Sequence, residues 1–193
     1  MFFQGYYQVA GKIDATLLEQ VNANIVAFEQ CQAYNFKHGE WLRLDSYFNP
    51  ENYKLEDIAG PEIINTVTAM FPGDTLFGWS VSYLPGKSDV VDHIDRMLFH
   101  RLAKRVIVIT TDTSDVLNWH WHSDKTKVNY LLEYGNVYRL NTAITHGLKN
   151  NNTENRRALY FDMMPTRLYE KFKSHSDIVS VILSDAVGEK HVL

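Results

Sequence analysis

Residues 90–100, VVDHIDRMLFH, carry a histidine and an aspartate two positions apart in an otherwise apolar, strand-like run. In a β-strand the side chains of residues i and i+2 leave the same face, so His93 and Asp95 would point into one space. An imidazole and a carboxylate that share a space form either a hydrogen-bonded pair or two of the three ligands of a metal site. A third ligand elsewhere in the chain would favour the metal site.

The chain has three His-x-Asp segments, at residues 93–95, 122–124 and 175–177, and each alone is a weak signal. His146, near the end of the apolar run AITHGL, is the candidate for a third ligand. The first segment begins 53 residues before it, which leaves room for about four strands and their turns. The second begins only 24 residues before it, and the third follows it. The spacing therefore favours His93 and Asp95 as the partners of His146.

Two histidines and one carboxylate hold one face of Fe(II) and leave the other coordination positions open for a cosubstrate, a substrate and dioxygen. Two of the ligands come from one strand and the turn after it, and the third comes from a strand distant in sequence but adjacent in a barrel. The residue types and their spacing therefore predict a non-haem iron site formed by His93, Asp95 and His146.

A pair of arginines adds a second element of this chemistry. Arg156 and Arg157 open the apolar segment RRALYFDMM, ten and eleven residues after His146. Strand alternation would turn one arginine inward and the other outward. An oxygenase that uses 2-oxoglutarate must hold the distal carboxylate of that cosubstrate, and a guanidinium suits this task because its planar fork matches a carboxylate. The residues alone leave open which of the two arginines faces inward.

The elements that must position these residues follow from hydrophobic periodicity. Apolar spacing predicts helices over residues 14–33 and 55–71, the second interrupted near Gly60 and Pro61. After Phe71 the segments become short and rich in β-branched and aromatic residues, which predicts an antiparallel sandwich or barrel that follows the helices in one α+β unit. The expected strands are 75–85, 88–95, 104–112, 116–123, 128–135, 136–141, 143–148 and 157–164, and residues 174–187 form either a short helix or a last strand.

Four segments together resemble a known family. HID at 93–95, RVIVIT at 105–110, GNVYRLNTAITHGLKN at 135–150 and RRALYFD at 156–162 are similar to the aspartyl/asparaginyl β-hydroxylase branch of the Fe(II)/2-oxoglutarate dioxygenases, which includes the bacterial cis-proline hydroxylases. The resemblance covers roughly residues 75–164. It implies a mainly β, α+β protein whose core is a double-stranded β-helix of the jelly-roll or cupin-like kind.

The predicted elements and the resemblance together give an expected domain organisation, and the resemblance implies a reaction. We expect a single domain, 1–193, with a helical part over 1–72 that packs on the outer sheet, a double-stranded β-helix over 73–165 and a C-terminal extension over 166–193. The cofactors would be Fe(II), 2-oxoglutarate as cosubstrate and O2. The reaction would hydroxylate a C–H bond of an amino-acid-like substrate, either a free amino acid or an Asp-, Asn- or Pro-type residue, and release succinate and CO2.

Residue by residue, the resemblance assigns the iron ligands to His93, Asp95 and His146. It assigns the 2-oxoglutarate-binding arginine to Arg156, because this residue stands ten positions after the distal histidine, and leaves Arg157 as the alternative. The remaining cosubstrate-binding positions are matched by Asn150 and, in an uncertain register with Arg101 nearby, by Arg105.

The segment NWHWHSD, residues 118–124, has no counterpart in that family pattern. As a strand it would place Trp119 and Trp121 on one face and His120 and His122 on the other. These four side chains could touch the substrate at the mouth of the pocket, or the strand could simply pack against the barrel.

Two other functions fit parts of the pattern. One is a non-oxygenase, cupin-like jelly roll that binds a metal through His120 and His122, although the next glutamate, Glu133, lies eleven residues after His122 and is too far for the usual cupin spacing. The other is a ligand-binding jelly roll in which His93 and Asp95 form only a hydrogen-bonded pair.

The composition of the chain limits the kinds of molecule that we expect it to bind. The chain of 193 residues has a formal net charge of −4 and a pI of about 6.0, which argues against a large phosphate-binding surface and hence against nucleic acid. Its one cysteine, Cys31, cannot form an internal disulfide. We find neither a secretory signal nor an apolar run long enough to span a membrane. We therefore expect a cytoplasmic protein that acts on a small molecule or a peptide.

Overall fold

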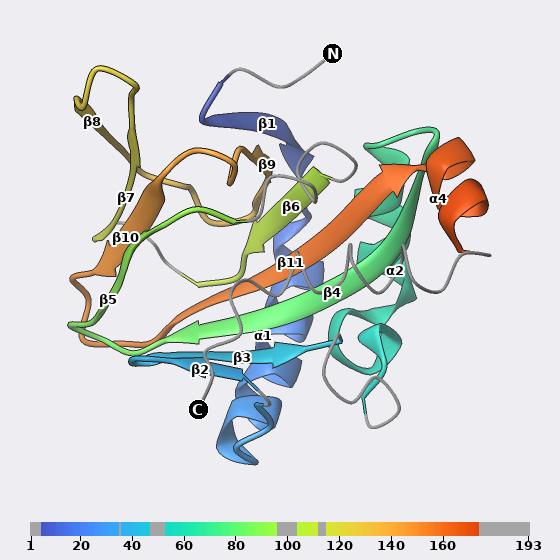
Figure 1. The fold of residues 1–193 in the computed structure, drawn as a ribbon. Coiled ribbons are helices and arrows are strands. Elements are labelled where there is room, and N and C mark those ends of the chain that lie inside the picture. Colours follow the sequence, from blue (N-terminus) through green and yellow to red (C-terminus); the bar gives the residue numbers. More distant parts are fainter. Residues whose placement is uncertain (1–4, 35, 47–52, 96–103, 112–114, 174–193) are drawn as a thin grey trace.

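The computed structural model describes residues 5–34, 36–46, 53–95, 104–111 and 115–173, and the account below concerns these residues (Figure 1). The predicted element at 174–187, the third His-x-Asp segment at 175–177 and Arg101 lie outside them. Within the described residues, the helices are α1 (Ala15–Gln30), α2 (Leu55–Ala69) and α4 (Thr166–Phe172). The strands are β1 (Tyr7–Lys12), β2 (Phe36–His38), β3 (Trp41–Asp45), β4 (Asp74–Leu84), β5 (Asp89–His93), β6 (Lys104–Ile109), β7 (Val116–Trp121), β8 (Lys127–Tyr130), β9 (Asn136–Leu140), β10 (His146–Asn150) and β11 (Arg156–Pro165).

These strands form two antiparallel sheets. The larger sheet has the order β1-β9-β6-β11-β4-β3-β2, and the smaller has the order β5-β10-β7-β8. From β4 onward the chain passes back and forth between them, because β4, β6, β9 and β11 lie in the larger sheet while β5, β7, β8 and β10 lie in the smaller one. This winding is that of a double-stranded β-helix and confirms the predicted fold class.

The two long helices cover the outer face of the larger sheet (Figure 1). One apolar core joins Leu18 and Ile25 of α1, Ile58 and Val67 of α2, and strand residues such as Phe161. The side chain of Asp14 caps α1 by accepting a hydrogen bond from the backbone N–H of Thr16 at 2.9 Å. The predicted packing of N-terminal helices on the outer sheet is therefore confirmed.

Helix α2 bends where the sequence indicated an interruption. Gly60 has φ 72° and ψ 156°, outside the helical region, and Pro61 follows it. Glycine adopts this positive φ without the steric cost that a Cβ would bring, and proline suits the first turn of the helical segment that follows.

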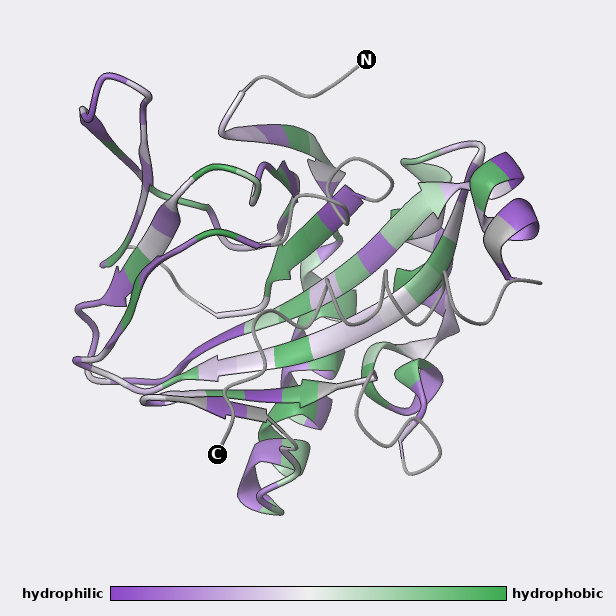
Figure 2. Ribbon diagram, viewed as in Figure 1, coloured by the Kyte–Doolittle hydropathy of each residue, from purple (hydrophilic) through white to green (hydrophobic). Residues whose placement is uncertain are grey.

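Alternation along β6 divides its side chains between two layers. Val106 and Val108 join the core beneath the helices, whereas Ile107 and Ile109 pack between the two sheets with Tyr138. A strand that is covered on both faces reads as a continuous apolar run, and Figure 2 shows β6 as hydrophobic along most of its length.

Two features of the secondary structure differ from the prediction. The region 1–72 contains β1, β2 and β3 as well as the expected helices. These strands were not predicted because β2 and β3 have only three and five residues and β1 is largely exposed, so their sequences lack a strong apolar alternation. The strand expected over 143–148 instead spans His146–Asn150, which makes His146 its first residue. No helix in the described part of the chain is both long and apolar enough to cross a membrane.

Candidate metal centre

The two candidate histidine ligands are cross-strand neighbours. β5 and β10 pair antiparallel with His93 directly opposite His146, and their ring centroids lie 4.2 Å apart. Asp95 follows the end of β5, and its backbone N–H donates to the carbonyl of Thr142 at 2.9 Å, which fixes the turn. Potential ligand atoms of His93, Asp95 and His146 all lie within 4.8 Å of one another. The structure thus brings the three predicted ligands together.

Both imidazoles are held with the same nitrogen turned toward this cluster. Nδ1 of His93 lies 2.8 Å from the carbonyl oxygen of Val91, and Nδ1 of His146 lies 2.8 Å from that of Ile144. A carbonyl oxygen can only accept, so each Nδ1 must carry the proton and donate it. A neutral ring in this orientation keeps its lone pair on Nε2, which is how metal-ligating histidines are commonly oriented.

The protonation state of His146 suits a ligand as well. Loss of hydration on burial lowers the pKa of His146 to about 3, and the attraction of the Asp95 carboxylate opposes this shift only in part. His146 is therefore neutral near pH 7, and its Nε2 lone pair is available.

The carboxylate of the cluster is held by an arginine. Arg105 of β6 donates from Nη1 to Oδ2 of Asp95 at 3.0 Å, and from Nε and Nη2 to the two oxygens of Asp162 at 3.0 and 3.2 Å. Arg105 and Asp162 stand opposite each other in the pairing of β6 with β11. The sequence suggested that Arg105 contacts the cosubstrate, whereas these contacts are with two protein carboxylates.

The two consecutive arginines lie on opposite faces of β11. Arg156 lines the cavity beside the histidines and is only 2% exposed. Its Nη1 makes a long contact of 3.4 Å with the hydroxyl of Tyr160, and its Nε has no hydrogen-bond partner among the described residues. Arg157 faces the other way and pairs with Glu29 of α1 through Nε at 2.7 Å and Nη2 at 2.6 Å. The cavity therefore has in Arg156 a buried guanidinium that the described protein groups satisfy poorly.

This cavity lies between the two sheets and is partly open to solvent. Its walls come from both sheets and include residues that the sequence analysis did not single out. They are Trp41, Arg43, Val90, His93, Asp95, Arg105, Asn118, His120, Tyr130, Leu140, Thr142, His146, Gly147, Leu148, Arg156 and Tyr160.

Strand β3 contributes an unpredicted part of this wall. The Trp41 ring centroid lies 6.1 Å from that of His93, and the Arg43 guanidinium lies 5.1 Å from the Trp41 ring centroid. Nη2 of Arg43 donates to the hydroxyl of Ser80 at 3.0 Å. The available signal was the segment WLRLD, in which tryptophan and arginine are two positions apart and so share a strand face.

Of the four predicted substrate-contacting residues on 118–124, only His120 lines the cavity. Its Nε2 lies 2.9 Å from the carbonyl of Asn141, to which it must donate, and its Nδ1 therefore accepts from the hydroxyl of Tyr130 at 2.8 Å. Burial lowers the pKa of His120. Both ring nitrogens are thus committed to protein partners, and this neutral ring offers the cavity surface rather than a metal ligand.

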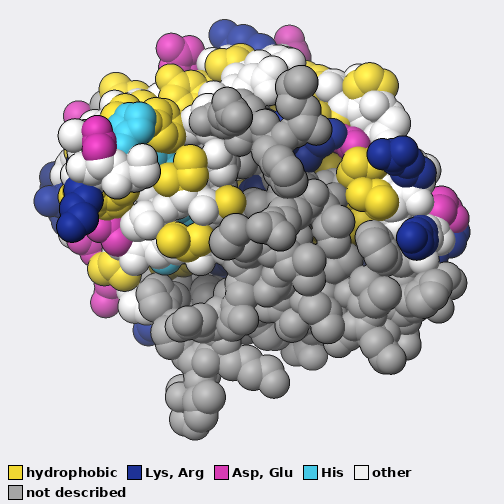
Figure 3. All heavy atoms as spheres, turned by 45° about the horizontal axis from the view of Figure 1, so that its top comes forward, with side chains coloured by type: hydrophobic (Ala, Val, Ile, Leu, Met, Phe, Trp, Pro, Cys, Tyr) yellow, Lys and Arg dark blue, Asp and Glu magenta, His cyan; other side chains and the backbone are white. Residues whose placement is uncertain are grey.

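The other three side chains lie outside the cavity lining. Trp119 and Trp121 donate their indole N–H groups to the two oxygens of Asp92, at 2.5 and 2.8 Å. His122 is exposed and makes an edge contact with the ring of Tyr6. On the face seen in Figure 3, histidine side chains reach the surface beside hydrophobic ones. The tryptophans and the histidines therefore lie on opposite faces of the strand, as predicted. A cupin-like metal site on His120 and His122 is not supported, because only His120 lines the cavity and both of its ring nitrogens have protein partners.

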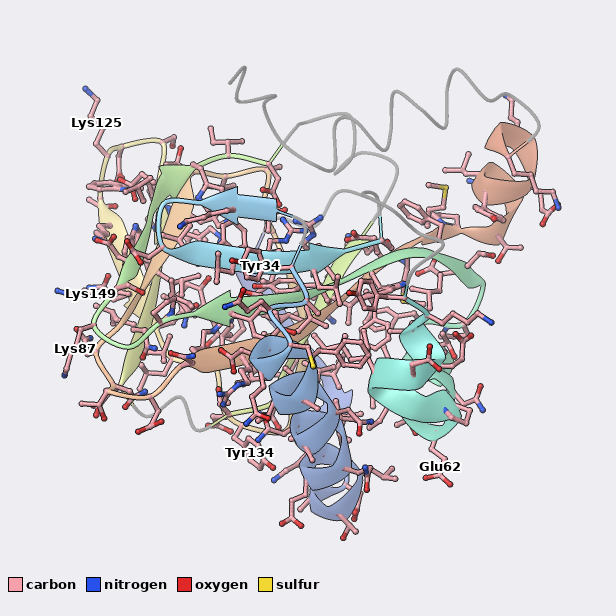
Figure 4. All side chains as sticks on the ribbon, turned by 90° about the horizontal axis from the view of Figure 1, so that it is seen from below. Tyr34, Glu62, Lys87, Lys125, Tyr134 and Lys149 are labelled. Atoms are coloured by element: carbon pink, nitrogen blue, oxygen red, sulfur yellow. The ribbon has the colours of Figure 1, made fainter. Side chains whose placement is uncertain are left out.

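Asn150 is fully buried but does not line the cavity. Its Nδ2 donates to the carbonyls of Leu84, Pro85 and Glu154 at 2.8–3.2 Å, and its Oδ1 accepts from the backbone N–H of Asn152 at 3.1 Å. These bonds fasten the loop after β10 to the connection between β4 and β5. Lys87 and Lys149, near this loop, point outward in Figure 4.

We predict that Asn150→Ala lowers the free energy of unfolding by about 2–4 kcal/mol, because it leaves buried carbonyls without donors. Metal affinity should stay within about twofold of the wild type. Urea denaturation and metal titration would check the two parts. Asn129→Ala, at an exposed asparagine of β8, is the control and should change stability by less than about 0.5 kcal/mol. A large loss of metal or cosubstrate affinity in a folded Asn150→Ala protein would instead support the cosubstrate role suggested by the sequence.

No protein-family model and no curated protein sequence matches this chain. Solved structures do match its fold. The non-heme alpha-ketoglutarate-dependent epimerase SnoN from nogalamycin biosynthesis has a TM-score of 0.64 at 13% identity, over 82% of this chain and 76% of that one. A Pseudomonas putida prolyl-4-hydroxylase has a TM-score of 0.62 at 10% identity, over 83% and 93%. The Trichoplax adhaerens prolyl hydroxylase, solved with a hypoxia-inducible-factor peptide fragment, has a TM-score of 0.62 at 9% identity, over 85% and 86%.

The chain has the fold of the 2-oxoglutarate-dependent oxygenases. At these identities the likeness concerns the fold alone, and these structures do not single out the aspartyl/asparaginyl β-hydroxylase branch. Residues of β5, β10 and β11 meet at one cavity of this fold. The chemistry of that cavity has to be argued from its own side chains.

Proposed function

We propose that this protein is an Fe(II)- and 2-oxoglutarate-dependent dioxygenase that hydroxylates a C–H bond of an amino-acid-like substrate. One observation carries the proposal. A cavity of the oxygenase fold holds two histidines with Nε2 prepared for a metal, a neighbouring carboxylate, and a buried guanidinium whose Nε has no partner among the described residues. A divalent metal on the first three groups and a dicarboxylate on the guanidinium would together satisfy the whole set.

The donor set fits these groups. His93, Asp95 and His146 would hold Fe(II), since two imidazoles and one carboxylate leave positions open for further ligands. Arg156 would pair with the distal carboxylate of 2-oxoglutarate through a charge-assisted hydrogen bond. Bound together, the metal and cosubstrate would supply, with O2, the oxidising power to convert a C–H bond to C–OH, with succinate and CO2 as coproducts.

The chain's own residues orient the metal-binding groups and limit the access of water to the cavity. The backbone carbonyls of Val91 and Ile144 fix the ring orientation of the two histidines. The apolar side chains of Val90 and Leu148, from the two ligand-bearing strands, line the same cavity. An apolar wall limits access of water and strengthens the charge interactions of Arg156 and Asp95 inside the cavity.

The substrate class rests on the sequence motifs, which are similar to those of the aspartyl/asparaginyl β-hydroxylase branch and its cis-proline hydroxylase relatives. An amino-acid-like substrate is also compatible with the prolyl hydroxylases among the similar structures. The cytoplasmic location and the division of the chain into parts at residues 72 and 165 stay predictions.

The test is succinate formation from 2-oxoglutarate in the presence of Fe(II), O2 and a panel of free amino acids and short Asp-, Asn- and Pro-containing peptides. We expect one class of panel members to stimulate succinate release with formation of a hydroxylated product, detected by NMR and mass spectrometry. His146→Ala, checked for folding, should release no succinate above background. A protein that binds the metal but neither binds nor consumes 2-oxoglutarate would instead be a cupin-like metal-binding or ligand-binding jelly roll.

A further inference from the structure

A chain of three charged side chains runs from the larger sheet to the candidate metal ligands. Asp162 of β11 is fully buried, Arg105 of β6 is 4% exposed, and Asp95 stands at the cavity. Arg105 contacts Asp162 through Nε and Nη2, and Asp95 through Nη1. The three side chains thus form one continuous ionic network, Asp162–Arg105–Asp95.

The two oxygens of Asp95 have different surroundings within this network. Oδ2 accepts the Nη1–H of Arg105 at 3.0 Å, whereas Oδ1 lies 3.9 Å from Nε2 of His93. Oδ1 is therefore the oxygen on the side of the histidine lone pair. A carboxylate held in this way presents one oxygen to a metal and keeps the other on the guanidinium.

The partner of Arg105 on its other side explains how the guanidinium keeps this geometry. Asp162 accepts from two of the three nitrogens of Arg105, which fixes the plane of the fork and directs Nη1 toward Asp95. Asp162 also shares the positive charge of Arg105. Without that second carboxylate, more of the attraction of Arg105 would act on Asp95 and compete with a metal ion for its oxygens.

We propose that Asp162, acting through Arg105, is a positioning residue that makes Asp95 a ligand through one oxygen only. The inference rests on the proposed function, because it concerns the same metal centre. Its consequence is that one carboxylate occupies one coordination position, so that the remaining positions stay open for the cosubstrate and O2. A buried carboxylate outside the ligand cluster thereby controls both the affinity and the coordination number of the metal.

The test is titration of the full-length protein with Co(II), whose visible bands respond to the number and arrangement of its ligands. We expect Asp162→Asn to weaken Co(II) binding about 10- to 100-fold, the usual effect of losing a group that orients a metal ligand, and to change the visible spectrum of the bound ion. Arg105→Lys keeps the positive charge but lacks the fork, so it should change the spectrum in the same way. A fold defect alone would lower the fraction of protein that binds without altering the spectrum of the ion that is bound.

Asp74→Asn is the matched control. Asp74 is a buried carboxylate that pairs with Lys104, the neighbour of Arg105 on β6, and it is not among the residues that line the cavity. Its loss removes a comparable ion pair, and we expect neither the Co(II) affinity nor the spectrum to change.

The outcomes separate this inference from the proposed function. Wild-type affinity and an unchanged spectrum in folded Asp162→Asn would overturn the positioning role while leaving the metal site in place. If Asp162→Asn does not fold, Arg105→Lys decides in the same way. A folded wild-type protein that binds no Co(II) would overturn the proposed metal centre itself, and the inference with it.

Discussion

Anaerobic addition of Fe(II) and 2-oxoglutarate to the protein is expected to produce a weak visible absorption band, and His93→Ala is expected to abolish it. The band arises only when the keto acid chelates the metal, so it reports both groups at once. His93 presents Nε2 to the cluster because its Nδ1 donates to the carbonyl of Val91. Removing this imidazole leaves two of three ligands, and we expect metal affinity to fall by more than about 100-fold, beyond the loss that an outer partner causes.

His122→Ala is the control for this titration. His122 is an exposed histidine on the segment after β7, outside the cavity lining, so its removal should leave the band and the metal affinity unchanged. A band that survives in His93→Ala would show that the metal binds elsewhere. Absence of the band in a folded, metal-competent wild-type protein would contradict the use of 2-oxoglutarate.

Arg156→Met is expected to weaken 2-oxoglutarate binding about 30-fold to several thousand-fold, as expected for loss of one member of a desolvated charge pair worth about 2–5 kcal/mol. Methionine replaces the aliphatic stem of arginine but carries no guanidinium and no charge, so the wall keeps an apolar side chain there while the distal carboxylate loses its partner. The absorption band provides the measurement, with 2-oxoglutarate titrated at saturating Fe(II). Metal binding in the absence of the cosubstrate should be unchanged.

The same variant should be more stable than the wild type when no ligand is bound. Arg156 is 2% exposed, and its Nε has no partner among the described residues, so the ligand-free protein bears the cost of a buried, poorly paired charge. We expect Arg156→Met to raise the free energy of unfolding by about 1–2 kcal/mol, or the Tm by roughly 2–8 °C. Opposite effects on stability and on ligand binding are typical of functional residues.

Arg157→Met is the matched control, since it removes the neighbouring guanidinium from the opposite face of β11. Arg157 pairs with Glu29 and lies outside the cavity lining. Its loss should leave 2-oxoglutarate affinity unchanged and slightly lower stability. Equal loss of cosubstrate affinity in both variants would contradict the assignment of the cosubstrate to Arg156.

The local pattern of apolar, glycine and proline residues was enough to predict the two long helices and most of the strands from the sequence. Helix periodicity and the Gly60-Pro61 interruption predicted α1 and α2, and the strand-like segments predicted an antiparallel sandwich or barrel, because these signals depend only on near neighbours in the chain. The double-stranded β-helix was implied by the resemblance of four segments to a known family. Strand geometry likewise predicted that His93 and Asp95, two residues apart, share a face. It predicted that the consecutive residues Arg156 and Arg157 point to opposite faces.

Long-range pairing decided what local pattern left open. Alternation placed Arg156 and Arg157 on opposite faces, but only the packing of α1 on one face of β11 determined that Arg157 meets Glu29 and Arg156 meets the cavity. The opposition of His93 and His146 depends on the register of β10 against β5, which no property of either strand alone specifies.

The short strand β3 and the partners of Arg105 were also decided by the tertiary structure. β3 acquires its place by pairing with β4, and only then do Trp41 and Arg43 reach the cavity. The family resemblance suggested Arg105 as a cosubstrate ligand, and the sequence could not indicate the carboxylates that its guanidinium contacts. The register of β6 with β11 supplied Asp162 and the turn after β5 supplied Asp95. The sequence by itself thus determined the residue types and the faces they occupy, whereas strand register determined which side chains meet, because contacts between distant segments depend on the whole fold.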